Sequence, residues 1–246
     1  SAFVDVESAH GRIIRRLLRD SVKGKTKWSP LENVRYMLQT AEPMYHRYIE
    51  PTRRNADIII INKYDPEKEA IRTGMSEVQM KFRTELDQEE LRKIGAERIS
   101  STKQADYYYT PKDGSFEKTG ELLRIRKEGE KIILTYKGPK TQTHNAVERQ
   151  KFEIEIDEAV EAEISSVYKI APKKITKDRT VYLLNGILFT LDSNVVKLED
   201  GNATKLGSFI EMRVPQEKNA ENKIDAIKKI LSISSDSAIL KSYFEM

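Results

Sequence analysis

The sequence predicts an α+β protein in which a mainly helical N-terminal segment precedes seven or eight antiparallel strands. The first observation is the strict alternation of apolar side chains with charged or amide side chains in Glu77-Val78-Gln79-Met80-Lys81, which is typical of a β-strand with two different faces. The second is that at least five later segments repeat this alternation. Such strands either expose their charged faces to water one by one or close into a barrel that encloses the charge. The alternation alone leaves both arrangements open.

The composition excludes several kinds of site. Basic residues (43) barely outnumber acidic ones (39), so the net charge of +4 gives no reason to expect a specific nucleic-acid partner. Cysteine is absent, which excludes disulfides and thiolate catalysis. The three histidines lack metal-ligand spacing, so any metal site must use oxygen ligands, which favours magnesium, manganese or calcium. No apolar run is long enough to span a membrane and no signal peptide is evident, so we expect a cytoplasmic protein without a membrane partner.

The first sixty residues favour helices between two short strands. A strand at residues 4–6 precedes an arginine-rich helical pattern, and Ser29-Pro30 predicts a second helix with Ser29 as its N-cap. This helix continues or restarts after Pro43, and Pro51 ends it. Residues 56–61 are an apolar run with the length of a buried strand. We expect this strand to seek a partner in another chain, for example in a homodimer.

A polar stretch at residues 62–74 divides the chain, so we expect one unit at residues 1–63, a linker at residues 64–75 and a second unit at residues 76–246. In the second unit, Asp87 and Glu90 predict the capping box of a helix, and Asn185-Gly186 predicts a hairpin turn. Residues 140–146 predict a polar loop. We expect strands at residues 76–83, 104–109, 121–127, 131–137, 149–156, 175–183, 187–192 and 206–214. We expect helices at residues 87–94, 158–168, 220–230 and 236–243.

The charged faces of these strands carry both signs. The basic set comprises Lys81, Arg124, Arg126, Lys137, Arg149, Lys151, Lys177, Arg179 and Arg213. The acidic set comprises Glu77, Glu153, Glu155, Asp192 and Glu211. If these faces line a tunnel, it suits a polyanion together with a divalent cation, because lysine and arginine bind phosphate oxygens and carboxylates bind the metal.

The order of the motifs resembles the CYTH family, also called triphosphate tunnel metalloenzymes. Glu77-x-Gln79-x-Lys81 is similar to the family signature Glu-x-Glu-x-Lys. The family's other motifs follow in its order: Leu123-Arg124-Ile125-Arg126, Leu134-Thr135-Tyr136-Lys137-Gly138-Pro139, Lys151-x-Glu153-x-Glu155, Lys177-x-Arg179, Asp192 and Leu206-Gly207-Ser208-Phe209-Ile210-Glu211. The resemblance implies an eight-stranded antiparallel β-barrel with covering helices, a tunnel that binds triphosphates, and magnesium or manganese as cofactor.

Carried over by position, the resemblance implies three groups of site residues. Those that would hold metal are Glu77, Gln79, Glu153, Glu155, Asp192 and Glu211. Those that would bind the phosphates are Lys81, Arg124, Arg126, Lys137, Arg149, Lys151, Lys177 and Arg179. Glu77, Lys81 and Glu211 are the expected catalytic residues. Two positions depart from the pattern: Gln79 replaces a glutamate, and Arg213 stands where a final glutamate is usual. Both departures lower the negative charge available to a metal.

The N-terminal unit resembles the C-terminal third of uridine kinase and phosphoribulokinase-type kinases. The resemblance is carried by Arg15-Arg16-Leu17-Leu18-Arg19-Asp20, Glu42-Pro43-Met44, Tyr48-Ile49-Glu50-Pro51-Thr52-Arg53-Arg54 and Ala56-Asp57-Ile58-Ile59-Ile60. The phosphate loop of such a kinase is missing, so no kinase activity is expected. The first functional hypothesis is metal-dependent hydrolysis of tripolyphosphate, pyrophosphate or a nucleoside triphosphate. The alternatives are a non-catalytic polyphosphate or nucleotide sensor attached to a kinase domain, and an adenylyl cyclase.

Overall fold

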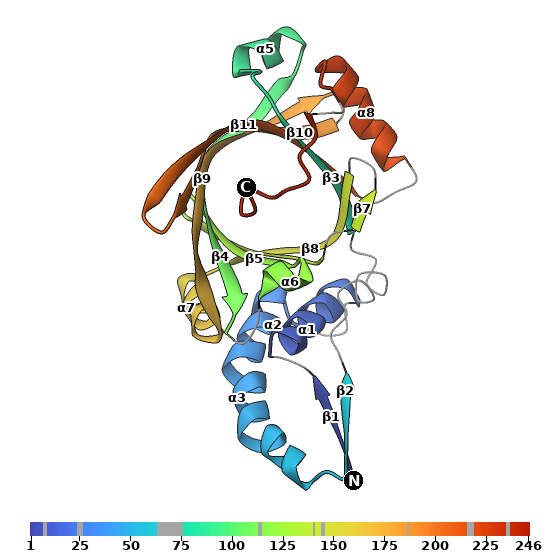
Figure 1. Ribbon diagram of the computed structural model, residues 1–246, viewed down its shortest axis with the longest axis vertical. Coiled ribbons are helices and arrows are strands. Elements are labelled where there is room, and N and C mark those ends of the chain that lie inside the picture. The colour runs from blue at the N-terminus through green and yellow to red at the C-terminus, as the bar shows by residue number, and fades with distance from the viewer. Residues whose placement is uncertain are drawn as a thin grey trace.

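The predicted barrel is present and closed. The structure is a computed structural model, and it describes residues 1–6, 9–23, 27–62, 76–112, 115–139, 141–143, 146–185, 187–215, 219–234 and 237–246. Eight antiparallel strands follow one another around a ring in the order β3-β11-β10-β9-β4-β5-β6-β8, and β8 pairs back onto β3 (Figure 1). The strands are β3 (Ser76–Arg83), β4 (Glu97–Pro111), β5 (Leu122–Glu128), β6 (Lys131–Lys137), β8 (Ala146–Ile156), β9 (Tyr168–Leu184), β10 (Ile187–Glu199) and β11 (Asn202–Pro215). Of the two arrangements that the alternation allowed, the barrel is confirmed.

Apolar side chains of the strands point outward, and helices cover parts of this outer surface. On β3, Met80 and Phe82 pack in one cluster with Ile224 and Ile227 of α8 (Ala220–Ile230). Leu91 of α5 (Gln88–Lys93) is fully buried in the same cluster. The predicted capping box of α5 is confirmed. Much of the core therefore lies outside the barrel wall. The charged side chains of the same strands face the lumen, and they share it with a smaller apolar cluster that includes Tyr108, Phe209 and Tyr243.

The N-terminal helices cover another part of the wall. Ile13 of α1 (Ala9–Lys23) and Val34 of α2 (Pro30–Tyr36) share a buried cluster with Leu123 and Tyr136 of the barrel. The predicted start of α2 is confirmed, with Ser29 as N-cap in a capping box. Helical turns continue past α2 through η1 (Met37–Ala41), α3 (Glu42–Met44), η2 (Tyr45–Ile49) and η3 (Glu50–Asn55). Another pair of barrel helices is α6 (Phe116–Thr119) and α7 (Glu158–Val167).

The apolar strand at the end of this unit finds a partner within the chain. β2 (Ile58–Asn62) pairs in parallel with β1 (Ala2–Val6), with Phe3 opposite Ile59 and Val4 opposite Ile60. Both faces of β2 remain open, because the isoleucines at positions 58–61 are 42–61% exposed. The expected strand is therefore confirmed, but its side chains are not buried.

Two expectations were wrong: the polar loop at residues 140–146 and the helix at residues 236–243. Within the predicted polar loop at residues 140–146, residues 141–143 form the short strand β7 (Thr141–Thr143), which pairs with β8. His144 lies outside the described residues. The predicted helix at residues 236–243 is also absent from the described part of the tail, because residues 237–246 run as bends and turns into the centre of the ring (Figure 1). The tail instead bonds to β3: Ala238 bridges Phe82, and the Ile239 amide donates to the Lys81 carbonyl at 2.7 Å.

None of the described helices is both long and apolar enough to cross a bilayer.

Candidate functional site: a basic tunnel

Half of the side chains that line the central cavity of the barrel are basic. Six of the twelve residues around its central cavity are lysine or arginine, and a single one, Glu211, is a carboxylate. The six are Lys81, Arg124, Lys137, Lys177, Arg179 and Arg213. They come from β3, β5, β6, β9 and β11, and the inward phase of each strand follows from the alternation of its side chains. The tunnel surface is therefore built to receive negative charge.

Asp106 on β4 is a buried counter-ion for basic side chains of the neighbouring strands β5 and β9. It was not among the residues predicted from the sequence. Its carboxylate accepts from Arg126 at 2.6 and 3.0 Å and from Lys177 at 3.2 Å. Arg124 lies 3.5 Å from the carboxylate oxygen that also accepts from Lys177. Burial alone would raise the pKa of Asp106, but these three cations hold that pKa well below its ordinary value. The sequence does contain a signal for this position, because Gln104, Asp106 and Tyr108 alternate along the strand and therefore share one face.

A second buried network joins both acidic residues that were predicted on β10 and β11. Arg179 donates to Asp192 at 2.6 and 2.5 Å and reaches Glu211 at 3.3 Å. Arg213 donates from Nε to the other Glu211 oxygen at 2.5 Å. Burial would raise the pKa of Glu211, but Arg213 and Arg179 hold that pKa well below its usual value. Both carboxylates are ionised and are already engaged by arginines.

The two residues of the β3 signature whose side chains the structure describes, Gln79 and Lys81, also line the central cavity. Gln79 accepts a hydrogen bond from Lys137 Nζ at 2.8 Å through its side-chain oxygen. Lys81 lies in the tunnel, where burial lowers its pKa to about 8 although Glu211 and Asp192 oppose this effect. Burial likewise lowers the pKa of Lys177 to about 7, against Asp106 and Asp192. A bound polyanion would raise the pKa of both amines, because a nearby negative charge favours the protonated form.

The C-terminal tail occupies part of this tunnel. Tyr243 is buried and donates its hydroxyl to Asp192 at 2.8 Å. Lys81 donates to the Lys241 carbonyl at 3.1 Å and lies 3.9 Å from the centre of the Tyr243 ring, and Lys177 lies 4.9 Å from it. A carbonyl oxygen and an aromatic face thus stand where two ammonium groups could meet an anion. Sequence reasoning missed this contact, because it joins residues that lie far apart in the chain.

Other predicted site residues lie away from the central cavity. Lys151 and Glu153 on β8 pair with each other at 3.5 Å, and Glu153 also accepts from Thr135 at 3.1 Å. Burial opposes the shift, but Lys151 and Arg124 lower the pKa of Glu153 to about 2. Glu155 is exposed and pairs with Lys131 at 3.5 Å. None of these side chains lines the cavity around Lys81 and Glu211 among the residues that the structure describes.

Two predicted residues can be placed only by their backbone. Glu77 and Arg149 stand opposite each other where β3 pairs with β8. Their side chains lie outside the described part of the structure. Their predicted roles in metal binding, catalysis and phosphate binding therefore stay predictions.

The described residues do not fit a divalent metal ion. They contain no group of three or more aspartate, glutamate or histidine side chains that could surround one. Asp192 and Glu211 share Arg179, and the Gln79 oxygen already accepts from Lys137. A cation entering this part of the tunnel would have to displace an arginine from its carboxylates.

The fold and the site together define a closed antiparallel barrel around a basic tunnel. Residues 75–243 match the CYTH domain, and the chain belongs to the CYTH domain family. A protein of Methanocaldococcus jannaschii with the name "Putative adenylate cyclase" is 29% identical over 167 residues, which are 64% of this chain and 89% of that protein. A conserved hypothetical protein of Pyrococcus furiosus, 29% identical, superposes with a TM-score of 0.53 over 69% of this chain and 98% of its own.

Two further relatives match only parts of longer proteins. The "Inorganic pyrophosphatase TTM2" of Arabidopsis thaliana is 28% identical over 152 residues, which are 60% of this chain and 22% of that protein. A uridine kinase of Lactococcus lactis is 46% identical over 59 residues, which are 24% of this chain and 27% of the kinase, and this match lies in the N-terminal part. The chain thus spans about a fifth of one relative and about a quarter of the other. Both resemblances expected from the sequence are confirmed.

Proposed function

We propose that the tunnel binds the polyphosphate group of a small molecule and that this binding does not require a divalent cation. The observation that carries the proposal is the cavity lined by six lysine and arginine side chains against the single carboxylate of Glu211. Phosphate oxygens are bound most strongly by charge-assisted hydrogen bonds of this kind, above all where water is excluded. A bound anion favours the protonated forms of Lys81 and Lys177, whose pKa values burial lowers to about 8 and about 7.

Calorimetry with tripolyphosphate tests this proposal. We expect binding in the presence of EDTA, and an affinity at least about tenfold weaker in Lys137→Gln, which removes one charge from the tunnel. Lys131→Gln is the matched control, because Lys131 lies on the same strand β6 but is exposed and pairs with Glu155. Binding that is absent with EDTA, or that both substitutions weaken equally, contradicts the proposal.

Hydrolysis of the bound polyphosphate by a divalent-metal-dependent reaction is a second candidate function. It is supported by the similarity to the Arabidopsis inorganic pyrophosphatase and by the position of Glu211, which pairs with Lys81 across β11 and β3. Gln79 and Arg213 weigh against it, because both reduce the negative charge that a metal needs. Whatever metal takes part would have to rearrange the contacts of Arg179 with Asp192 and Glu211.

Phosphate release separates the two functions. The protein is incubated with tripolyphosphate, pyrophosphate or ATP, with magnesium or manganese, and with EDTA as the blank. Hydrolysis predicts release that Glu211→Gln abolishes and that Glu199→Gln, at a half-buried glutamate that pairs with Lys197 away from the cavity, leaves unchanged. Release of no phosphate from any of the three would exclude hydrolysis and leave a binding module. Formation of cyclic AMP from ATP in the same incubation would instead indicate a cyclase.

A further inference from the structure

Thr135 on β6 lies between two long charged side chains of the neighbouring strands. It stands opposite Arg124 where β6 pairs with β5, and opposite Glu153 where β6 pairs with β8. Residues directly opposite each other on antiparallel strands lie on the same face, with Cβ atoms about 5 Å apart. Thr135 is fully buried. Because its side chain is short, both neighbours can reach its hydroxyl group.

The hydrogen bonds of this hydroxyl group have a fixed direction. Arg124 donates to Thr135 Oγ1 at 2.8 Å, and Thr135 donates to Glu153 at 3.1 Å. Burial raises the pKa of Glu153, but Lys151 and Arg124 lower it to about 2, so Glu153 is ionised. An ionised carboxylate only accepts hydrogen bonds, and a hydroxyl group has a single proton. The proton of Thr135 therefore points to Glu153, and an oxygen lone pair is left for Arg124.

The next row of side chains lacks this hydroxyl group and is arranged differently. Two residues along each strand, Ile133 stands between Arg126 and Glu155. There Arg126 donates to Asp106 at 2.6 and 3.0 Å, and Glu155 is exposed. Among the described residues around the central cavity, Arg124 is present and Arg126 is not. The arginine beside the threonine thus lines the cavity, whereas the arginine beside the isoleucine is bound to a carboxylate.

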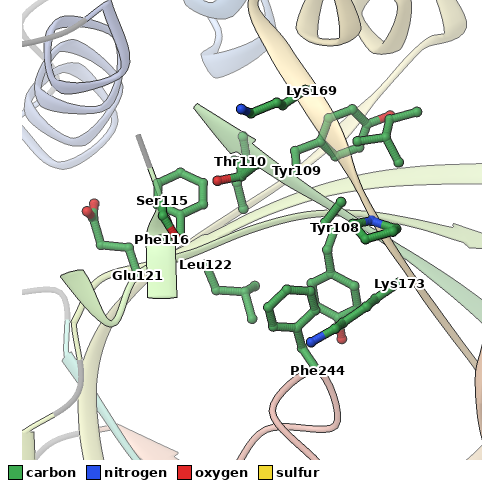
Figure 2. A pocket seen from close by; sticks show the side chains of 14 residues that line it. Tyr108, Tyr109, Thr110, Ser115, Phe116, Glu121, Leu122, Lys169, Lys173 and Phe244 are labelled. Atoms are coloured by element: carbon green, nitrogen blue, oxygen red, sulfur yellow. The ribbon is translucent and has the colours of Figure 1, made fainter. Parts of the chain in front are cut away.

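Asp106 is also within reach of Arg124. The distance from Arg124 Nη1 to Asp106 is 3.5 Å, against 2.8 Å for the bond from Nη2 to Thr135. Tyr108, which stands opposite Arg124 on β4, packs on Phe244 with ring centres 4.7 Å apart (Figure 2). Arg124 Nε is buried and has no acceptor among the residues that the structure describes. The bond to Thr135 therefore keeps the guanidinium group apart from Asp106, with hydrogen-bonding capacity still unused.

We infer that Thr135 is a positioning residue, which holds Arg124 at the cavity for a bound polyphosphate. The inference rests on the proposed binding of polyphosphate in the tunnel and adds to it a residue outside the cavity lining. Without the hydroxyl group, Arg124 would move onto Asp106, as Arg126 has done, and the cavity would lose one of its six cations. Glu153, which the family resemblance assigned to metal, orients the hydroxyl group in this account.

Calorimetry with tripolyphosphate in EDTA tests the inference on the full chain. Thr135→Val removes the hydroxyl group and keeps the shape, and we expect it to weaken binding about fivefold or more. Thr135→Ser keeps the hydroxyl group and should stay within about twofold of the wild type. Thr180→Val is the matched control, because Thr180 is 1% exposed and its hydroxyl lies 3.1 Å from that of Ser101, away from the cavity. It should also change affinity less than about twofold.

The outcomes separate this inference from the tunnel proposal. Wild-type affinity in Thr135→Val overturns the inference and leaves the tunnel proposal intact. Absence of binding to the wild type overturns both. Thr135→Ala is judged by the same criteria if denaturant unfolding shows that Thr135→Val does not fold.

A double-mutant cycle separates positioning from a general effect on the barrel. Arg124→Gln alone should weaken tripolyphosphate binding about tenfold or more. Adding Thr135→Val to Arg124→Gln should weaken it less than about twofold further, because no guanidinium group is left to hold. A further loss as large as that in the wild-type background would show that Thr135 acts on the barrel as a whole, and would overturn the inference.

Discussion

The barrel interior buries charged side chains, whereas the N-terminal sheet exposes apolar ones. Inside the barrel, Asp106, Asp192 and Arg179 are 5% exposed or less, and each is paired. In the sheet of β1 and β2, the isoleucines at positions 58–61 are 42–61% exposed, on both faces of the strand. Buried charge is tolerated at these three positions because each of them is paired with an opposite charge. Exposed isoleucines in the second region contribute little to folding and leave a surface that a further layer of structure could cover.

The comparison identifies where each region is vulnerable. Removing one charge from the interior leaves its partners buried and unpaired, so stability should fall steeply. Adding one charge to the exposed sheet costs no burial, so stability should hardly change. The predictions below follow this order, from the largest expected effect to the smallest.

Asp106→Asn should be the most damaging change. It leaves Arg126, Lys177 and Arg124 without their shared anion, and loss of one partner from a buried network typically costs about 3–5 kcal/mol. Urea unfolding in a phosphate-free buffer measures the loss. Asp178→Asn is the control, since Asp178 lies on β9 beside Lys177 but is partly exposed and bonds to Asn194. A loss below about 1 kcal/mol for Asp106→Asn would contradict the account of the network.

Removing residues 241–246 should open the tunnel. The deletion takes away the Lys241 carbonyl and the Tyr243 ring that contact Lys81, so the tripolyphosphate site no longer has to expel them. We expect the apparent dissociation constant to fall about tenfold or more, because the fraction of competent sites rises. A deletion of residues 245–246 alone is the control. Unchanged or weaker binding after the longer deletion would show that the tail does not compete.

Affinity for a polyanion should fall as the pH rises through the pKa of Lys177. That pKa is about 7 in the folded protein, lowered by burial from 10.5. Above it, the folded protein has lost this proton and the unfolded chain still holds it, so the free energy of unfolding rises with pH while anion affinity falls. We expect tripolyphosphate to bind about tenfold more weakly at about pH 9 than at about pH 6. Lys177→Arg should make the profile shallower and leave the part that Lys81, with a pKa of about 8, contributes. A variant profile as steep as that of the wild type would rule out Lys177 as a cause.

The barrel was predictable because its signal is local. Alternation with a period of two marks each strand within a few residues, and it assigned Lys81, Lys137, Arg179 and Glu211 to the lumen correctly. It could not tell how far each strand reaches: β10 continues past the expected end at residue 192 to Glu199 and turns at Asp200 and Gly201, both with positive φ.

The parts that escaped prediction depend on contacts between distant residues. Tyr243 meets Asp192 across 51 positions, and a pattern that favours a helix in the tail is overridden by pairing with β3. The alternation along β4 is enough to predict that Asp106 faces the lumen. Its pairing with Arg126 and Lys177 could not be predicted, because it requires that β4, β5 and β9 lie side by side. Likewise, nothing in the sequence indicates that Arg179 joins both Asp192 and Glu211.

Ile60→Lys should have the smallest effect on folding and should test what the exposed sheet does. Ile60 is 50% exposed, so we expect the free energy of unfolding to change by less than about 0.5 kcal/mol, as for most surface substitutions. An open apolar strand favours association with another copy or with further strands of a parallel sheet. Sedimentation velocity over a range of concentrations should therefore show less self-association in the variant than in the wild type. Lys93→Gln, at a 69% exposed side chain on α5, is the control and should alter neither quantity. A wild type that stays monomeric at every concentration would show that the isoleucines do not join copies of this chain. A large loss of stability in Ile60→Lys would show that Ile60 contributes more to folding than its exposure indicates.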